Sequence, residues 1–98
     1  MKIKLIKKVE GCLEGTNVYD LFTSDPITRD FLESFDDETK LKISTPADGV
    51  DKAFYRLIFP GKITLKGALG ISSMRCILPT ENLQENLREF IAKAENRN

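Results

Sequence analysis

Hydrophobic and polar residues alternate in several short segments of the chain, with the two-residue period of a half-buried β-strand. Near the N-terminus Ile3 and Leu5 alternate with lysines, and further along Leu41 and Ile43 do the same. Other apolar runs of similar length are bounded by turn residues. We therefore predict strands over residues 2–9, 39–45, 52–59, 62–67 and 71–78.

Two turn signals join neighbouring strands in the second half of the chain. Asp48-Gly49 is a typical tight-turn pair. In the segment 59–62, Pro60 stands at the first central position and Gly61 at the second, which is the pattern of a type II turn. Because the connections from 39 to 78 are short, these strands are expected to form an antiparallel meander.

Helical spacing of apolar residues appears in a first stretch over about 16–36. Val18, Leu21 and Phe22 stand at positions i, i+3 and i+4. Asp25-Pro26 then supplies an N-cap residue followed by proline at the first helical position. The apolar stripe after this restart consists of Ile27, Phe31, Leu32 and Phe35.

A second helix is predicted over about 80–95. Thr80 is its expected N-cap, and Glu81 follows in the first turn. Its apolar face consists of Leu83, Leu87, Phe90, Ile91 and Ala94.

These elements predict a single globular domain over 1–98, with the last few residues disordered. The fold class is α+β, a mostly antiparallel sheet of about five strands with helices (about 16–36 and 80–95) packed on one face. By alternation, the side chains facing the helices are Ile3, Leu5, Leu41, Ile43, Tyr55, Leu57, Phe59, Ile63, Leu65, Met74, Cys76 and Leu78. The opposite face presents Lys2, Lys4, Lys40, Lys42, Phe54, Arg56, Ile58, Lys62, Thr64, Lys66, Arg75 and Ile77.

Charge is divided unevenly between these elements. The formal net charge is zero, from 15 basic and 15 acidic residues. The predicted strands contain 11 of the basic residues and no acid, which leaves a charge of −11 on the rest of the chain. Such polarisation influences which partners a surface attracts.

Most catalytic chemistry has no candidate residues in this chain. It has no histidine, so Ser-His and Cys-His pairs and the usual zinc ligands are absent. Cys12 and Cys76 are interpreted as buried or spare thiols, and no cofactor or metal site is expected. An enzyme would need a deep pocket that gathers the acids of 36–38 (Asp36, Asp37 and Glu38) with a lysine. The preferred interpretation of those acids is a solvated helix end.

We therefore expect a non-enzymatic macromolecule-binding protein, of the inhibitor or regulator type, that uses the basic and apolar outer face of its sheet. A protein partner or a homodimer is weighed first, with apolar residues at the centre and cations around them. The alternative is a domain for single-stranded nucleic acid, in which the cations contact phosphates and Phe54 stacks on a base. The partner-binding residues in both cases are Phe54, Arg56, Ile58, Arg75, Ile77, Lys42 and Lys66.

The net charge counts against nucleic acid, because an acidic remainder would repel phosphates unless it lies far from the site. No small-molecule substrate is indicated. The N-terminus carries lysines where a signal peptide needs an unbroken apolar stretch, and no segment approaches the length of a membrane span. A cytoplasmic protein without a membrane partner is therefore expected.

Overall fold

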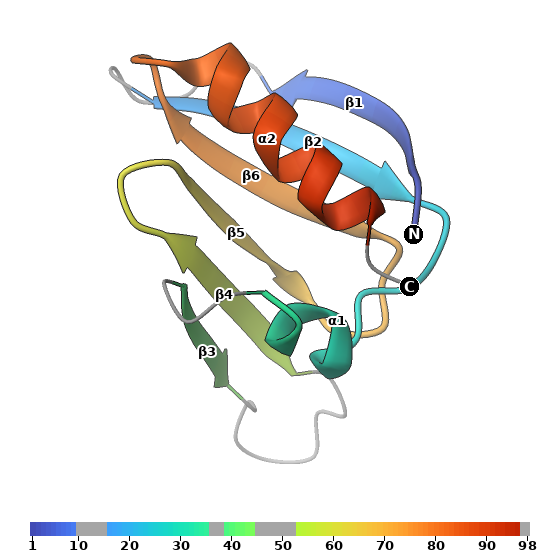
Figure 1. The fold of residues 1–98 in the computed structure, drawn as a ribbon. Helices are drawn as coiled ribbons and strands as arrows, with labels where there is room; N and C mark the ends of the chain where they lie inside the picture. Colours follow the sequence, from blue (N-terminus) through green and yellow to red (C-terminus); the bar gives the residue numbers. More distant parts are fainter. Residues whose placement is uncertain (10–15, 36–38, 45–52, 97–98) are drawn as a thin grey trace.

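A computed structural model describes residues 1–9, 16–35, 39–44 and 53–96. Within them, six strands form one antiparallel sheet in the order β1-β2-β6-β5-β4-β3 (Figure 1). The strands are β1 (Ile3–Val9), β2 (Thr16–Thr23), β3 (Lys40–Ser44), β4 (Phe54–Phe59), β5 (Ile63–Ala68) and β6 (Ser73–Pro79). The helices are α1 (Arg29–Glu33) and α2 (Leu83–Glu95). The α+β class is confirmed, but the sheet has six strands where about five were expected.

The meander predicted for the second half of the chain is confirmed. Strands β3, β4, β5 and β6 pair in sequence order, each antiparallel to the next. Between β4 and β5, the Lys62 amide donates to the Phe59 carbonyl at 2.9 Å, and Gly61 has a φ of 75°. This bond and this φ are those of the type II turn that Pro60-Gly61 predicted. The Asp48-Gly49 turn lies outside the described residues.

The helix predicted over 16–36 is wrong for its first half, which is strand β2. This strand pairs with β1 on one side and with β6 on the other. Its residues Tyr19, Leu21 and Thr23 face the core, and Val18, Asp20 and Phe22 face away from it. A central strand has partners on both edges, and the β-branched and aromatic content of TNVYDLFT suits that position. The same apolar residues fit helical spacing, so the period alone was misleading.

Helix α1 begins later than the Asp25-Pro26 pair predicted. The Ile27 amide donates to the Ile71 carbonyl at 2.9 Å, and the Ile27 carbonyl accepts from Gly70 at 2.8 Å. These bonds hold the segment against the start of β6, so the helix forms only after Thr28. The Thr28 hydroxyl caps it by accepting from the Phe31 amide at 3.1 Å.

Helix α2 starts at Leu83, three residues beyond the predicted start, because β6 continues to Pro79. Its N-cap is Asn82, in the left-handed conformation with φ of 57°, and the Asn82 side chain makes no capping bond. The predicted apolar face is confirmed: Leu87, Phe90 and Ala94 are buried, and the other two residues pack beside them. Asn96 caps the end of the helix, and residues 97–98 lie outside the described part.

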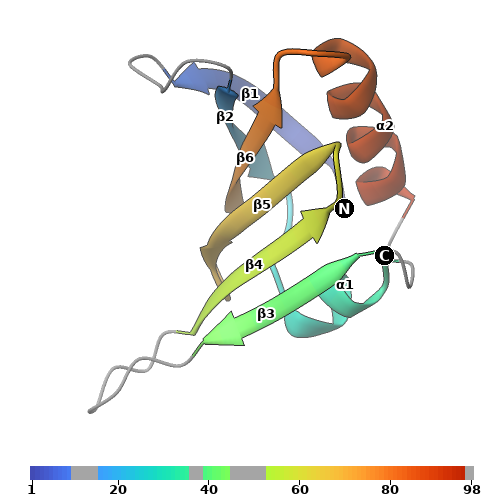
Figure 2. The same cartoon turned by 90° about the vertical axis from the view of Figure 1, so that its left-hand side faces the viewer.

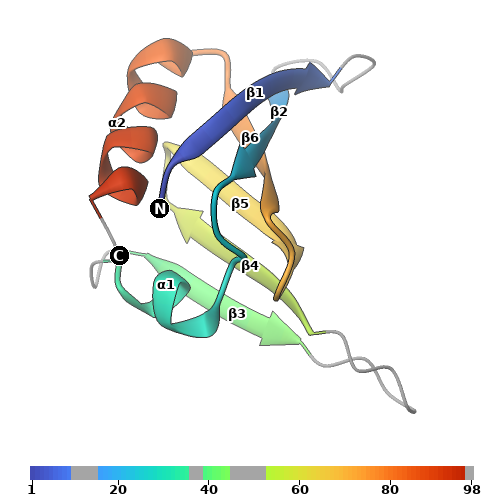
Figure 3. The same ribbon diagram turned by 90° about the vertical axis from the view of Figure 1, so that its right-hand side faces the viewer.

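The core lies on one face of the sheet, which we call the inner face. Its buried side chains come from β2, β4, β5 and β6, and from both helical segments. Figures 2 and 3 show the sheet from its edges, with α2 lying across β6 and β5. The predicted inward side chains are confirmed with one exception: Leu5 is 57% exposed. A register shift between Ile3 and Leu5 reverses the alternation of β1 at that point.

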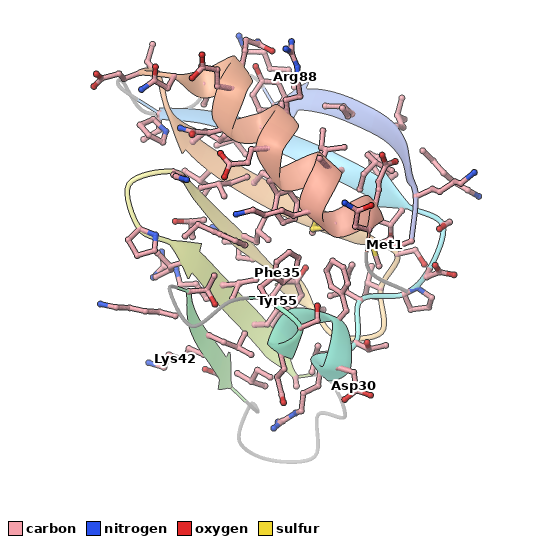
Figure 4. All side chains as sticks on the ribbon, viewed as in Figure 1. Met1, Asp30, Phe35, Lys42, Tyr55 and Arg88 are labelled. Atoms are coloured by element: carbon pink, nitrogen blue, oxygen red, sulfur yellow. The ribbon has the colours of Figure 1, made fainter. Side chains whose placement is uncertain are left out.

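An aromatic cluster ties α1, β4 and α2 together. The ring of Phe35 lies 5.2 Å from Phe31, 5.3 Å from Phe59 and 5.8 Å from Phe90, measured between centroids. Rings at these separations add to the free energy gained from burial. Figure 4 labels Phe35 and Tyr55, which both belong to the hydrophobic core.

Tyr55 occupies space that Gly67 leaves open on the paired strand. A Cβ atom at Gly67 would stand 2.8 Å from the Tyr55 hydroxyl oxygen, so glycine is needed for this close approach. Among the described residues the Tyr55 hydroxyl has no hydrogen-bond partner, although its side chain is buried. Burial therefore raises the pKa of Tyr55 above its ordinary value.

Candidate functional site

Four basic residues form an uninterrupted row across the outer face of the sheet. Lys42 of β3 pairs with Arg56 of β4, Arg56 with Lys66 of β5, and Lys66 with Arg75 of β6. All four side chains are exposed. We call Lys42, Arg56, Lys66 and Arg75 the cation ladder. Its three strand intervals span about 14 Å, because neighbouring strands lie about 4.8 Å apart.

The same row continues into the other half of the sheet. Arg75 pairs with Asp20 of β2, and Asp20 pairs with Lys7 of β1. The Asp20 carboxylate accepts two bonds from the Arg75 guanidinium, at 2.9 Å from Nε and 3.1 Å from Nη2. This bidentate pair fixes the orientation of the guanidinium and closes the ladder on the β2 side.

Like charges directly opposite one another on a sheet are destabilising. In the described part of the chain, none of the ion pairs involves Lys42, Arg56 or Lys66. On the helical side, by contrast, Lys62 and Lys93 both contact Glu89, at 3.2 and 3.3 Å. The bonds from these two lysines lower the pKa of Glu89. The ladder therefore concentrates positive charge that nearby described acids do not neutralise, apart from Asp20.

Apolar rows flank the ladder on both sides. On one side lie Phe54, 51% exposed, and Phe22, 37% exposed, each two residues along its strand from a member of the charged row. Leu5 pairs with Phe22 and extends that row onto β1. On the other side the paired residues are half-buried and consist of Val9, Val18, Ile77, Thr64 and Ile58.

All seven partner-binding residues predicted from the sequence therefore lie on one face. Their arrangement differs from the expected apolar centre with a charged surround. The cations occupy the middle row, whereas Phe54 lies on one side of it and Ile58 and Ile77 lie on the other. The two isoleucines are half-buried between neighbouring side chains, so Phe54 is the more accessible apolar group.

An open pocket of about 530 Å³ lies over the ladder. It is lined by Lys42, Ser44, Phe54, Tyr55, Arg56, Lys66, Gly67 and Arg75. A second pocket of about 240 Å³ shares Lys66, Gly67 and Arg75 with it and reaches Phe22 and Asp20. The first volume is within the range of ordinary ligand sites. The two pockets together follow the outer face from β3 to β2.

The acidic residues of the helices lie on the opposite side of the sheet. Both helical segments place buried side chains in the core on the inner face. The exposed acids Asp30, Glu33, Glu85 and Glu89 belong to these helices. Figures 2 and 3 show α1 and α2 on the side of the sheet that is opposite to the outer face. The expected separation of charge therefore has a structural basis, with two exceptions. Asp20 is an acid within a strand, and Lys62, expected on the outer face, contacts Glu89 of α2 on the helical side.

The acids of 36–38 and the two cysteines were the other candidate residues in the sequence, and the described residues give them no catalytic or metal-binding arrangement. Asp36, Asp37 and Glu38 lie outside the described residues, and so does Cys12. Cys76 is a buried free thiol whose pKa is raised by burial, so it is not an accessible nucleophile. Within the described ranges, no three potential ligands gather as a metal ion would require. Nor does any helix there have the length and apolar character needed to cross a membrane.

Sequence reasoning missed several residues of the outer face, among them Asp20, Phe22 and Leu5. The first two were assigned to a helix, and Leu5 was assigned to the inner face. The alternation of Tyr19, Leu21 and Thr23 with Val18, Asp20 and Phe22 was the signal that could have placed β2. The register shift that exposes Leu5 has no comparable signal in the sequence.

Comparisons of the chain with protein-family models, with curated proteins and with solved structures found no match.

Proposed function

We propose that this protein is a non-enzymatic binding module that holds a negatively charged macromolecule on the outer face of its sheet. The observation that carries the proposal is the cation ladder. Three of its four members have no ion-pair partner among the described residues, and adjacent members repel one another. A polyanion would remove that repulsion on binding.

The flanking residues support a macromolecular partner. Exposed apolar side chains next to a charged row give a surface that is partly desolvated when covered. The exposed aromatic side chains of that surface are Phe54 on β4 and Phe22 on β2. A small inorganic anion would contact the ladder and leave these rings uncovered.

A homodimer through this face is disfavoured by the same geometry. Twofold symmetry places identical patches against each other. Two copies would then bring their ladders together, and like-charge contacts at an interface are costly. A partner that supplies negative charge avoids this cost. An acidic protein surface and a nucleic acid both meet the requirement.

Retention on an immobilised polyanion such as heparin tests the proposal. With a sequence pI near 6.3 and a formal net charge of zero, the chain has no excess of positive charge at neutral pH. We expect it to be retained at low salt nevertheless, because the ladder is a local concentration of charge.

The matched variants are Arg56→Glu and Arg88→Glu, which change the net charge equally. Arg56 belongs to the ladder, whereas Arg88 is exposed on α2, at the helical side (Figure 4). We expect loss of retention in Arg56→Glu and little change in Arg88→Glu. Equal losses in both variants, or no retention of the wild type, would contradict the proposal.

A further inference from the structure

Two exposed phenylalanine rings accompany the cation ladder along one side. Phe54 pairs with Ala68 on β5, and Phe22 pairs with Ser73 on β6. Ala68 and Ser73 are each two residues beyond the Lys66–Arg75 pair, and both line the smaller pocket. Between the two rings the row therefore carries the small side chains of Ala68 and Ser73. We call the stretch from Phe54 to Phe22 the track.

The ladder and this track run side by side across the strands. Successive side chains on one face of a strand are two residues apart, which places the track about 7 Å from the ladder. A ligand along the ladder could therefore place flat groups on Phe54 and Phe22 while its charges remain over the cations. Two bonds to Asp20 hold the Arg75 guanidinium in place at the β2 end of the ladder.

We infer that the negatively charged partner is single-stranded nucleic acid, bound across the strands with phosphates on the cation ladder and bases on Phe54 and Phe22. This inference rests on the proposed function and names the partner class. Stacking needs bases whose faces are free, which a single strand offers and a duplex does not. The pocket of about 530 Å³ between Phe54 and the ladder has room for one nucleotide unit.

An acidic protein satisfies only part of this arrangement. Carboxylates would contact the ladder, but flat groups do not alternate regularly with charges along a protein surface as bases and phosphates do along a single strand. The placement of the helices also removes the argument against nucleic acid, because their acids lie on the other side of the sheet from the phosphates. The long-range effect of those charges is further reduced at physiological salt, where screening acts within about 8 Å.

Fluorescence anisotropy with labelled single-stranded RNA and DNA of about ten nucleotides tests the inference, with a duplex of the same sequence and a poly-glutamate peptide as comparison probes. Three to four phosphate contacts predict a slope of log K against log salt of about −2 to −3 for a single strand. The affinity should then fall about 20- to 50-fold between about 50 and 200 mM salt. Arg56→Glu should abolish binding, and Arg88→Glu should leave it nearly unchanged.

Phe54→Ala separates nucleic acid from other polyanions. Loss of one stacked base should weaken single-strand binding by about 5- to 150-fold, with a smaller or equal effect from Phe22→Ala. Neither variant should change the salt slope or the retention on heparin, because both leave the cations in place. Phe54 is half-exposed, so the variant should fold, and circular dichroism would confirm this.

The outcomes distinguish the two proposals. Suppose that heparin retention depends on Arg56, but oligonucleotide binding is insensitive to both phenylalanine substitutions or is no stronger than poly-glutamate binding. This result would overturn the nucleic-acid inference and leave the proposed function standing. Preference for the duplex would overturn it as well. Absence of binding to every polyanion at low salt would overturn both.

Discussion

The inner and outer faces of the sheet are built from the same strands but differ in what covers their side chains. On the inner face the apolar side chains are covered by α1, α2 and the aromatic cluster around Phe35. On the outer face the central row carries four neighbouring cations, and two phenylalanine rings stay exposed beside it.

This difference separates stability from binding. The inner face supplies the buried apolar area that stabilises the fold. On the outer face, repulsion between cations opposes the folded state, and the apolar surface that stays exposed contributes little to stability. Substitutions on the two faces should therefore have different consequences.

The largest expected effect is a contrast between two phenylalanines. Phe90→Ala should reduce the free energy of unfolding by about 3–5 kcal/mol, because Phe90 is 2% exposed and contacts Phe35 and Phe59. Phe54→Ala should change it by no more than about 0.5 kcal/mol. Urea denaturation of the two variants measures both values. Similar losses would show that the outer ring is also part of the core.

The Tyr55–Gly67 contact gives the next largest effect. Gly67→Ala should destabilise the fold by about 1–3 kcal/mol, because the new Cβ would stand 2.8 Å from the Tyr55 hydroxyl. Tyr55→Phe removes an unpartnered buried hydroxyl and should be neutral or stabilising. Combined with Gly67→Ala, it should recover part of the loss. A double variant as unstable as the sum of the two single changes would show that the hydroxyl is not the obstacle.

Alkaline pH should lower the free energy of unfolding through two buried groups of the inner face. Burial raises the pKa of Cys76 and of Tyr55 in the folded state, so each group holds its proton more tightly there than in the unfolded chain. The unfolded pKa values are about 9 for Cys76 and about 10 for Tyr55. The contribution of each group to the free energy of unfolding is therefore complete below its unfolded pKa and decreases as the pH rises above that value. Each group contributes a slope of about 1.4 kcal/mol per pH unit in that window.

Denaturation at several pH values measures this slope. Cys76→Ala should flatten it above pH 9, and Tyr55→Phe should flatten it above pH 10. The comparison is between variant and wild type at each pH, since lysines also titrate in this range. Parallel curves for all three proteins would contradict the assigned burial.

The smallest expected effect concerns the ladder itself. Lys66 stands between Arg56 and Arg75, so Lys66→Gln should relieve two repulsive contacts and raise the free energy of unfolding by about 0.2–1 kcal/mol at low salt. Added salt should shrink the gain. Arg88→Gln, on the helical side, should show no such salt-dependent gain. A destabilised Lys66→Gln protein would mean that the ladder is not a site of repulsion.

Much of the fold was accessible from sequence because local and tertiary preferences agree there. The meander from β3 to β6 has strict alternation and turn residues at its connections, and the four cations of the ladder were placed on the correct face. The prediction for the segment 16–23 was wrong because Val18, Leu21 and Phe22 fit the helical period, although the segment also fits the two-residue period of a strand. Only pairing with β1 and β6 decides between the two structures. The predicted start of α1 was wrong for a similar reason, because the backbone hydrogen bonds of Ile27 with Gly70 and Ile71 prevent a helix from starting at Asp25-Pro26.

These errors also hid part of the candidate site. With β2 assigned as a helix, Phe54 stood nearly alone among aromatic residues on the outer face, and nucleic acid was weighed below a protein partner. Strand β2 adds Phe22 to that face and Asp20 to the charged row. The register that aligns Lys42, Arg56, Lys66 and Arg75 in one row depends on three separate strand pairings, which no single segment of the sequence encodes.

The most direct test of the division between the two faces is an NMR titration that follows the arginine side-chain Nε–H signals as single-stranded oligonucleotide is added. Arg56 and Arg75 lie on the outer face, whereas Arg29 and Arg88 lie on α1 and α2. The account predicts large, saturable shifts for Arg56 and Arg75 and nearly constant signals for Arg29 and Arg88. Shifts confined to the helical arginines, or equal for all four, would contradict it.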